Sequence, residues 1–123
     1  MSDKPKPTDV NLHQKSRVLE IAFDDGSRFE LPCEYLRVYS PSAEVRGHGP
    51  GQETLQLGKE DVNITQIDPV GAYAIQLHFD DGHNTGIYSW ETLYQLGVEQ
   101  DRLWADYLQR LKEAGYERKV TTH

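Results

Sequence analysis

The sequence predicts an α+β protein in which two strand–turn–strand–helix units form a mostly antiparallel sheet, closed by a C-terminal helix. The run Phe-Asp-Asp-Gly occurs at residues 23–26 and again at 79–82, each time between two β-prone segments. Asp-Gly in that setting is typical of a hairpin turn. Across residues 99–114, apolar side chains recur every three or four positions and a glycine follows, which indicates an amphipathic helix with a glycine after its end.

The first unit is expected to span residues 18–39. Residues 18–23 and 28–31 are rich in apolar and β-prone side chains and flank the first Asp-Gly turn, so they are predicted to pair as a hairpin. Pro32 follows, and a proline suits the first turn of a helix because its missing N–H has no partner there in any case. Residues 33–39 are therefore predicted to form a short helix that ends before Pro41.

The second unit repeats this order after a polar segment rich in glycine and proline at residues 40–59. Residues 62–67 alternate as a strand, residues 73–79 and 84–88 flank the second turn, and a helix is expected from residue 89. We interpret the two units as an internal repeat. The alternative is that a common turn occurs twice, since the flanking strands match only in hydrophobic pattern. Six helical residues are expected to share one core: Tyr35, Leu36, Trp90, Leu93, Trp104 and Leu108.

A chain of 123 residues is long enough for one domain with a core of its own. We place that domain at residues 16–116, followed by a flexible tail at 117–123. Residues 1–15 are expected to be a flexible tail as well, because their prolines and scattered charges offer little that can pack.

Charge and cysteine content restrict the possible partners and compartment. The net charge of −7 opposes phosphate backbones and anionic lipid surfaces, so neither nucleic acid nor a membrane is expected to be a partner. No apolar run is long enough to span a bilayer. Cys33, the sole cysteine, cannot form an internal disulfide, and a reducing cytoplasm fits the chain best.

The sequence offers no catalytic machinery, and we expect that the protein is not an enzyme. It has no Gly-x-Ser-x-Gly elbow and no Cys/His arrangement typical of a nucleophile with its base. The paired aspartates at 24–25 and 80–81 lack the spacing of a calcium loop, and aspartate is favoured before glycine in tight turns. Turn formation therefore explains these carboxylates more simply than acid–base chemistry does.

Three stretches of the chain together resemble a known family. Residues 35–49 contain Leu-Arg and then Ser-Pro-Ser-Ala-Glu, residues 70–74 read Val-Gly-Ala-Tyr-Ala, and residues 79–90 contain Asp-Gly-His and then Tyr-Ser-Trp. From about residue 17 to residue 115 the chain resembles the gamma-butyrobetaine hydroxylase-like N-terminal domain family, in its standalone bacterial form. In the oxygenases that give the family its name, this domain precedes a catalytic domain that carries iron and uses 2-oxoglutarate. Similar domains are also attached to P-loop iron–sulfur carrier proteins.

The resemblance implies an accessory or interaction module, because 123 residues leave no room for either attached domain. Members fused to the oxygenase bind zinc through a cysteine cluster together with the histidine of Asp-Gly-His. Only His83 carries over, since serine, alanine and valine stand at residues 40–45 where the cysteines would fall. A structural zinc site with four nitrogen or sulfur ligands is therefore not expected. A weak zinc or iron site formed by His48 and His83 is the remaining metal alternative.

We predict a non-enzymatic binding module for another protein, with its site where the segment 40–49 meets the second Asp-Gly turn. Its polar contacts would be four cationic or titratable side chains: Arg37, Arg46, His48 and His83. One alternative is a hydrogen-bonded structural corner in which Arg37 or Arg46 pairs with Glu44. The rival function is a small metal-binding protein linked to iron or iron–sulfur handling.

Overall fold

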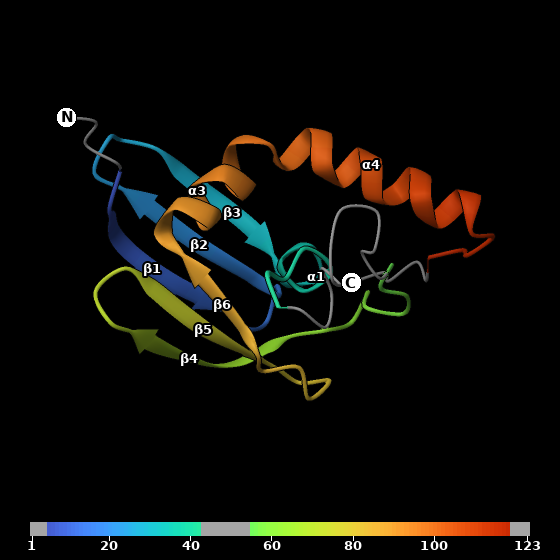
Figure 1. The fold of residues 1–123 in the computed structure, drawn as a ribbon, viewed down its shortest axis with the longest axis horizontal. Helices are drawn as coiled ribbons and strands as arrows, with labels where there is room; N and C mark the ends of the chain where they lie inside the picture. Colours follow the sequence, from blue (N-terminus) through green and yellow to red (C-terminus); the bar gives the residue numbers. More distant parts are fainter. Residues whose placement is uncertain (1–4, 43–54, 119–123) are drawn as a thin grey trace.

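The computed structural model describes residues 5–42 and 55–118, and it is an α+β fold of two three-stranded antiparallel sheets and three helices (Figure 1). The first unit comprises β1 (Pro7–His13), β2 (Val18–Phe23), β3 (Arg28–Pro32) and α1 (Cys33–Val38). The second comprises β4 (Ile64–Val70), β5 (Ala74–Phe79), β6 (Gly86–Ser89) and α3 (Trp90–Val98), and α4 (Gln100–Glu113) follows. The fold class and the C-terminal helix are confirmed. The strands form two sheets, β1-β2-β3 and β4-β5-β6, where the sequence suggested one.

The two units repeat each other down to the hydrogen bonds of their turns. Gly26 and Gly82 both have φ of 90°, a left-handed conformation that favours glycine. The amide of Gly26 donates to the carbonyl of Phe23, and that of Gly82 donates to Phe79, each over 3.1 Å. In each unit one further strand precedes the predicted hairpin. The internal repeat is therefore present, with three strands and a helix in each unit.

The additional strand of the first unit corrects the expected domain boundary. Residues 1–15 were expected to form a flexible tail, but Pro7–His13 pair with β2 along their length as β1. Val10 and Leu12 alternate with polar residues and pack partly buried against the core. At the other end, Arg118 lies within the expected C-terminal tail and pairs with Glu34 of α1. The ordered domain therefore extends beyond both predicted ends.

The core lies between the two sheets and the helices that follow them. Its fully buried members come from both units: Leu19, Ile21, Leu31, Tyr35, Leu36, Ile64, Leu77, Tyr88 and Leu93. Trp90 and Trp104 pack against this core but remain partly exposed. Leu108 was expected there and is 37% exposed, because the inward-facing positions of α4 are taken by Tyr107 and Leu111.

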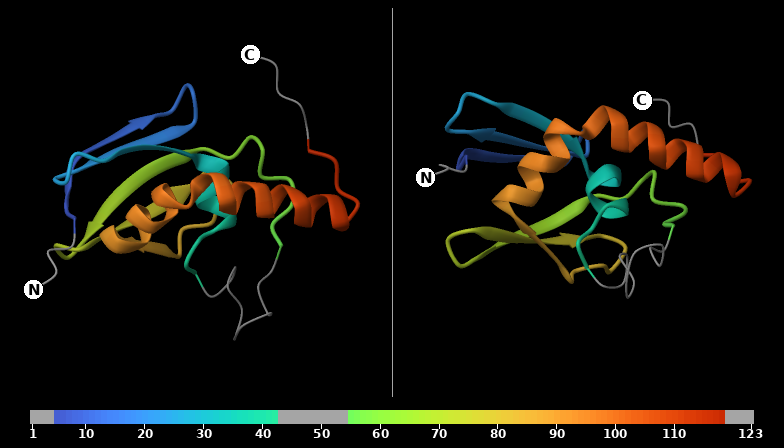
Figure 2. Two further views of the ribbon diagram at one scale, coloured as in Figure 1. Left: turned by 90° about the horizontal axis from the view of Figure 1, so that it is seen from above. Right: turned by 45° about the horizontal axis from the view of Figure 1, so that its top comes forward.

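The two later helices have caps that the sequence supplies. The Ser89 hydroxyl accepts the amide of Thr92 over 3.1 Å at the start of α3. After α4, Gly115 adopts φ of 75°. The helix α3 packs beside β3, and both views of Figure 2 show α4 extending beyond the two sheets at one end.

The contact between α3 and β3 gives a sharp test of the packing. A Cβ atom on Gly97 would lie 2.4 Å from Cγ of Phe29, far inside any real contact. Phe29 is itself held edge-on by Phe23 and Tyr94, with ring centroids 5.9 and 5.5 Å away. Alanine gains about 1 kcal/mol over glycine in a helix, but overpacking costs about 1 to 3 kcal/mol. We expect Gly97→Ala to destabilise the protein in urea unfolding.

The Phe29→Leu background provides the control for this substitution. A smaller side chain at residue 29 removes the collision, so Gly97→Ala should cost less there than in the wild type. A Gly97→Ala variant as stable as the wild type would show that the rings of Phe23, Phe29 and Tyr94 can move aside at no cost in stability.

Candidate functional site

The second Asp-Gly turn, where the sequence placed the binding site, is organised around Asp81. Its Oδ2 accepts from Nε of Arg37 over 2.9 Å and from Nζ of Lys59 over 2.6 Å. Its Oδ1 accepts the backbone amide of His83 over 3.1 Å. Partial burial by itself would raise the pKa of the Asp81 carboxyl, but these hydrogen bonds outweigh burial and lower the pKa to about 2. Asp81 is therefore a carboxylate at neutral pH.

His83 is buried beside this carboxylate. Its Nε2 lies 2.9 Å from Oγ of Ser40, directly after α1. The Ser40 hydroxyl also accepts the amide of Ser42 over 3.2 Å. The imidazole is thus tied to the segment that follows α1.

The structure brings together two of the four predicted site residues. Arg37 and His83 meet at Asp81, whereas Arg46 and His48 lie outside the described residues, as does Glu44. The Arg37 side chain is 9% exposed and its charge is paired. The described residues have the geometry of the alternative raised from the sequence, a hydrogen-bonded structural corner. The partner of Arg37 in this corner is Asp81. The binding role of the four residues stays a prediction.

The Asp-Gly turn of the first unit contains a hydrogen-bonded corner that matches the one at Asp81. Asp25 accepts the amide of Ser27 over 2.9 Å and the hydroxyl of Tyr94 over 2.6 Å. The Tyr94 hydrogen bond is the main cause that lowers the pKa of the Asp25 carboxyl. Tyr94 lies on α3 and Arg37 on α1, so the aspartate of each turn is bound by the helix of the other unit. Asp81–Arg37 is thus a cross-link between the two repeats.

Neither a nucleophile nor a metal centre is evident in the described part of the chain. Burial raises the pKa of the Cys33 thiol to about 11, and the thiol donates to the side-chain oxygen of Asn63 over 3.7 Å. Within residues 5–42 and 55–118, no three His, Cys, Asp or Glu side chains gather in a way that could hold a metal ion. His48 lies outside those residues, so the weak zinc or iron alternative with His83 stays a prediction.

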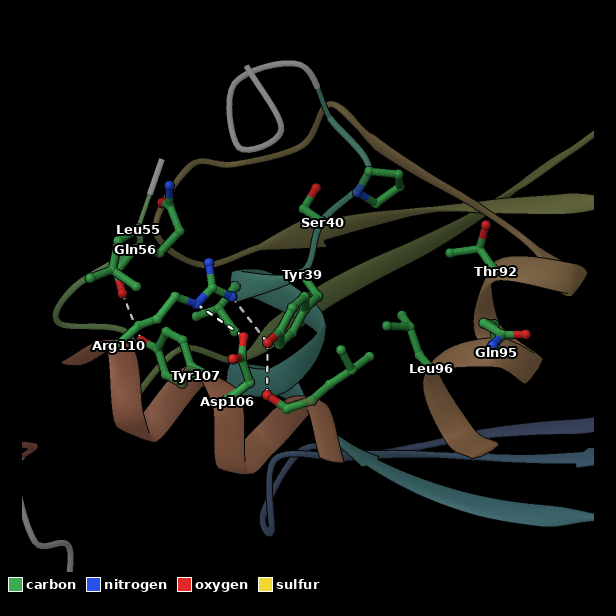
Figure 3. Close-up of a pocket in the computed structure, with 13 residues that line it drawn as sticks. Tyr39, Ser40, Leu55, Gln56, Thr92, Gln95, Leu96, Asp106, Tyr107 and Arg110 are labelled. Atoms are coloured by element: carbon green, nitrogen blue, oxygen red, sulfur yellow. Dashed lines mark hydrogen bonds and ion pairs between the residues drawn. The ribbon is translucent and has the colours of Figure 1, made fainter. Parts of the chain in front are cut away.

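A cleft of about 570 Å³ lies elsewhere, between the end of α1, the helices α3 and α4, and residues 55–56 (Figure 3). Its volume is in the range typical of ligand sites. Both apolar and polar side chains line it: Leu96 lies with Thr92 and Gln95 on one side in Figure 3, and Leu55 lies with Arg110 on the other. Tyr39 lies between Leu96 and Arg110 in Figure 3.

Arg110 is the one cation among the described lining residues of this cleft. Its Nη2 donates to the hydroxyl of Tyr39 over 3.2 Å, and its guanidinium lies 5.9 Å from the centre of that ring. Its Nε lies 3.2 Å from Oδ2 of Asp106 in an ion pair, yet it makes no hydrogen bond with any described residue. The Tyr39 hydroxyl donates to the carbonyl of Leu103 over 2.7 Å.

Sequence reasoning missed this cleft, because its walls come from segments far apart in the chain. Apolar side chains of α4, Trp104 and Leu108, were expected only in the core, whereas Leu103 of the same helix both packs against the core and contributes to the cleft. The available signal was Arg110, a cation on this helix whose charge the core cannot accommodate. Among the helices of the described ranges, none is long and apolar enough to cross a membrane.

Comparisons with known proteins agree with the fold. An NMR solution structure of a protein 53% identical to this chain superposes with a TM-score of 0.81 and covers 99% of this chain and 96% of its own. A second NMR structure, 41% identical, has a TM-score of 0.80 and covers 97% of each chain. A crystal structure from Acidithiobacillus ferrooxidans ATCC 23270, a DUF971-family protein of unknown function, is 42% identical with a TM-score of 0.64, covering 76% of this chain and 93% of its own.

A search of curated proteins gave no match. The family model described as gamma-butyrobetaine hydroxylase-like, N-terminal, matches residues 10–94, from within β1 to within α3. The resemblance inferred from the sequence is confirmed by this match: the chain belongs to the gamma-butyrobetaine hydroxylase-like N-terminal family.

Proposed function

We propose that the protein is a non-enzymatic, cytoplasmic accessory module that binds a segment of another protein in the cleft between α1, α3 and α4. The observation that carries this proposal is the contrast between two arginines. The Arg37 side chain is 9% exposed and pairs with Asp81, whereas the Arg110 side chain is 38% exposed and lines an open cleft of about 570 Å³. A binding site needs accessible groups of the second kind.

The chemistry of the described residues supports a binding role over a catalytic one. The Cys33 thiol is buried with a raised pKa, the opposite of what a nucleophile requires. The cleft combines apolar side chains with a few polar groups, a composition typical of recognition sites. The paired charges at Asp81 serve to join the repeats and need no ligand.

The tagged protein is used to capture binding partners from an extract of its natural host. The wild type is compared with one variant that fills the cleft and one that leaves it open. Gln95 is exposed on α3 and lines the cleft, so Gln95→Trp should block it without disturbing the core. Val98 is exposed on the same helix and does not line the cleft, so Val98→Trp is the matched control. We expect the wild type and Val98→Trp to retain a common partner that Gln95→Trp loses.

The same experiment separates the cleft from the site predicted by sequence. If Arg46→Ala removes the partner and Gln95→Trp keeps it, binding occurs at the segment 40–49 and the cleft proposal is wrong. A folded Gln95→Trp variant that captures every wild-type partner at equal yield also contradicts the proposal. Circular dichroism and thermal unfolding of each variant establish that it is folded.

A further inference from the structure

We infer that this cleft recognises a free carboxylate at the end of an apolar peptide, that is, the C-terminus of a partner protein. The inference rests on the proposed function, since it concerns the same cleft. It commits to the chemistry of the ligand: an anionic end group at Arg110 and apolar side chains toward Leu96 and Leu103. Charge complementarity at Arg110 and the apolar side chains in the lining carry it.

The guanidinium of Arg110 is only partly used by the protein. It has five N–H donors, and its sole hydrogen bond to a described residue goes to the hydroxyl of Tyr39. Its Nε is buried and makes no hydrogen bond, although Asp106 is 3.2 Å away. The Arg110 side chain as a whole is 38% exposed, so its terminal N–H groups, and not the buried Nε, are the donors that a ligand in the cleft can reach.

A carboxylate fits the exposed end of the Arg110 guanidinium better than a neutral acceptor does. The planar guanidinium presents parallel N–H groups that match the two oxygens of a carboxylate. Tyr39 fixes the guanidinium from one side by accepting from Nη2, and its own proton is committed to the carbonyl of Leu103. Arg110 is therefore the principal donor that this end of the cleft offers to a ligand.

The apolar side chains of the cleft determine what should precede the carboxylate. Leu96 reaches the cleft from α3, Leu103 from α4, and Pro41 from the segment after α1. In Figure 3, Leu96 and Arg110 lie on opposite sides of Tyr39, so a ligand spanning the cleft would meet both of them. A peptide whose last residues are apolar and whose C-terminus is free could make both contacts.

Asp106 distinguishes a carboxylate ligand from a cationic one. Its side chain is 56% exposed and that of Arg110 is 38% exposed, so solvent weakens the ion pair between them. A carboxylate ligand would be repelled by Asp106 and a cation attracted to it. Asp106→Asn should therefore strengthen binding of the predicted ligand and weaken binding of a cation.

The test is an NMR titration of the full chain with defined probes. One probe is an acetylated pentapeptide of alanine and leucine with a free C-terminus, the second is the same peptide amidated, and the third is octanoate. We expect the free peptide to shift the amide resonances of Leu96, Leu103 and Arg110. Amidation should weaken binding about tenfold or more, as should Arg110→Gln, because each removes a charge-assisted hydrogen bond.

Two variants complete the design. Arg102→Gln is the matched control, since Arg102 lies on the same helix, is 67% exposed, pairs with Glu99 and does not line the cleft. It should bind the free peptide like the wild type, and Asp106→Asn should bind it more tightly. Equal affinity for free and amidated peptides would overturn the inference, as would unchanged binding to Arg110→Gln. Octanoate binding more tightly than the free peptide would assign the cleft to small carboxylates instead of protein termini.

Failure of this inference is distinguishable from failure of the proposed function. If Gln95→Trp loses the captured partner but the amidated peptide binds as well as the free one, the cleft binds protein through other chemistry. If Gln95→Trp keeps every partner, the cleft is not the protein-binding site, whatever the titration shows.

Discussion

Replacing Asp81 by alanine is expected to destabilise the protein by about 3 kcal/mol, the low end for breaking a buried ion pair, because Arg37 is buried but Asp81 is partly exposed. The Arg37 side chain, 9% exposed, would remain in the core without its carboxylate. Its Nη1 already has no hydrogen-bond partner among the described residues, so the uncompensated charge has no second acceptor to turn to. Urea unfolding at neutral pH measures the loss.

Asp68→Ala is the control for this substitution. Asp68 also pairs with a basic side chain, His78, over 2.7 Å, but the two side chains are 43% and 24% exposed, and solvent-accessible pairs contribute about 1 kcal/mol or less. A loss under about 1 kcal/mol for Asp81→Ala would contradict the structural role given to the corner, and Arg37 would then be available for binding.

The Asp81 contribution also has a defined pH dependence. Its pKa in the folded protein is about 2, below the ordinary value of 3.8, so the unfolded chain takes up the proton first as pH falls. The stability due to Asp81 is therefore fully present above about pH 4 and is lost as pH falls toward 2. The stability difference between the wild type and Asp81→Ala should narrow over that window. A difference that stays constant down to pH 2.5 would contradict the hydrogen bonding at this carboxylate.

Local patterns in the sequence were sufficient for most of the fold. Asp-Gly requires a positive φ at glycine and so marks both hairpins, as Gly26 and Gly82 confirm. The three- and four-residue spacing in α4 reports a helix whatever it packs against. Which side of α4 faces the core cannot be predicted from this spacing alone, because it depends on the surface against which the helix packs. For this reason Leu108 was wrongly placed in the core.

The corner at Asp81 and the cleft depend on long-range contacts that no local pattern encodes. Arg37 and Asp81 are brought together only when α1 of one repeat reaches the turn of the other. The repeat recognised in the sequence was not sufficient: Arg37 and Tyr94 occupy related positions on their helices and both bind the opposite aspartate, but the repeat does not tell which turn each helix meets. The cleft is formed by side chains from four separate segments, and its volume depends on how far their helices stand apart.

Deleting the strand β1 is expected to have the second large effect on stability. The sequence suggested a flexible tail where the structure has this strand. Its pattern is weak: two prolines and several polar residues surround the apolar pair Val10 and Leu12. A strand at the edge of a sheet can be mostly polar, since one face and one edge meet solvent. Pro7 stands at the first position of β1, a place where proline is tolerated.

Removing residues 2–13 is therefore expected to cost about 3 kcal/mol or more in urea unfolding. The deletion withdraws Val10 and Leu12 from the core and leaves the apolar strand β2 as an exposed edge. The truncated protein should also associate, which size-exclusion chromatography would detect. A flexible tail would give neither effect.

Point substitutions separate the loss of packing from the loss of the strand itself. Val10→Ala with Leu12→Ala removes only the side chains that contact the core, and we expect it to cost about 2 kcal/mol, near the low end for such truncations because both residues are only partly buried. The matched double substitution Thr8→Ala with Asn11→Ala acts on exposed positions of the same strand and should change stability by less than about 0.5 kcal/mol. Equal effects from the two pairs would mean that β1 does not present one face to the core, and the register pairing Val10 with Ile21 would then be wrong.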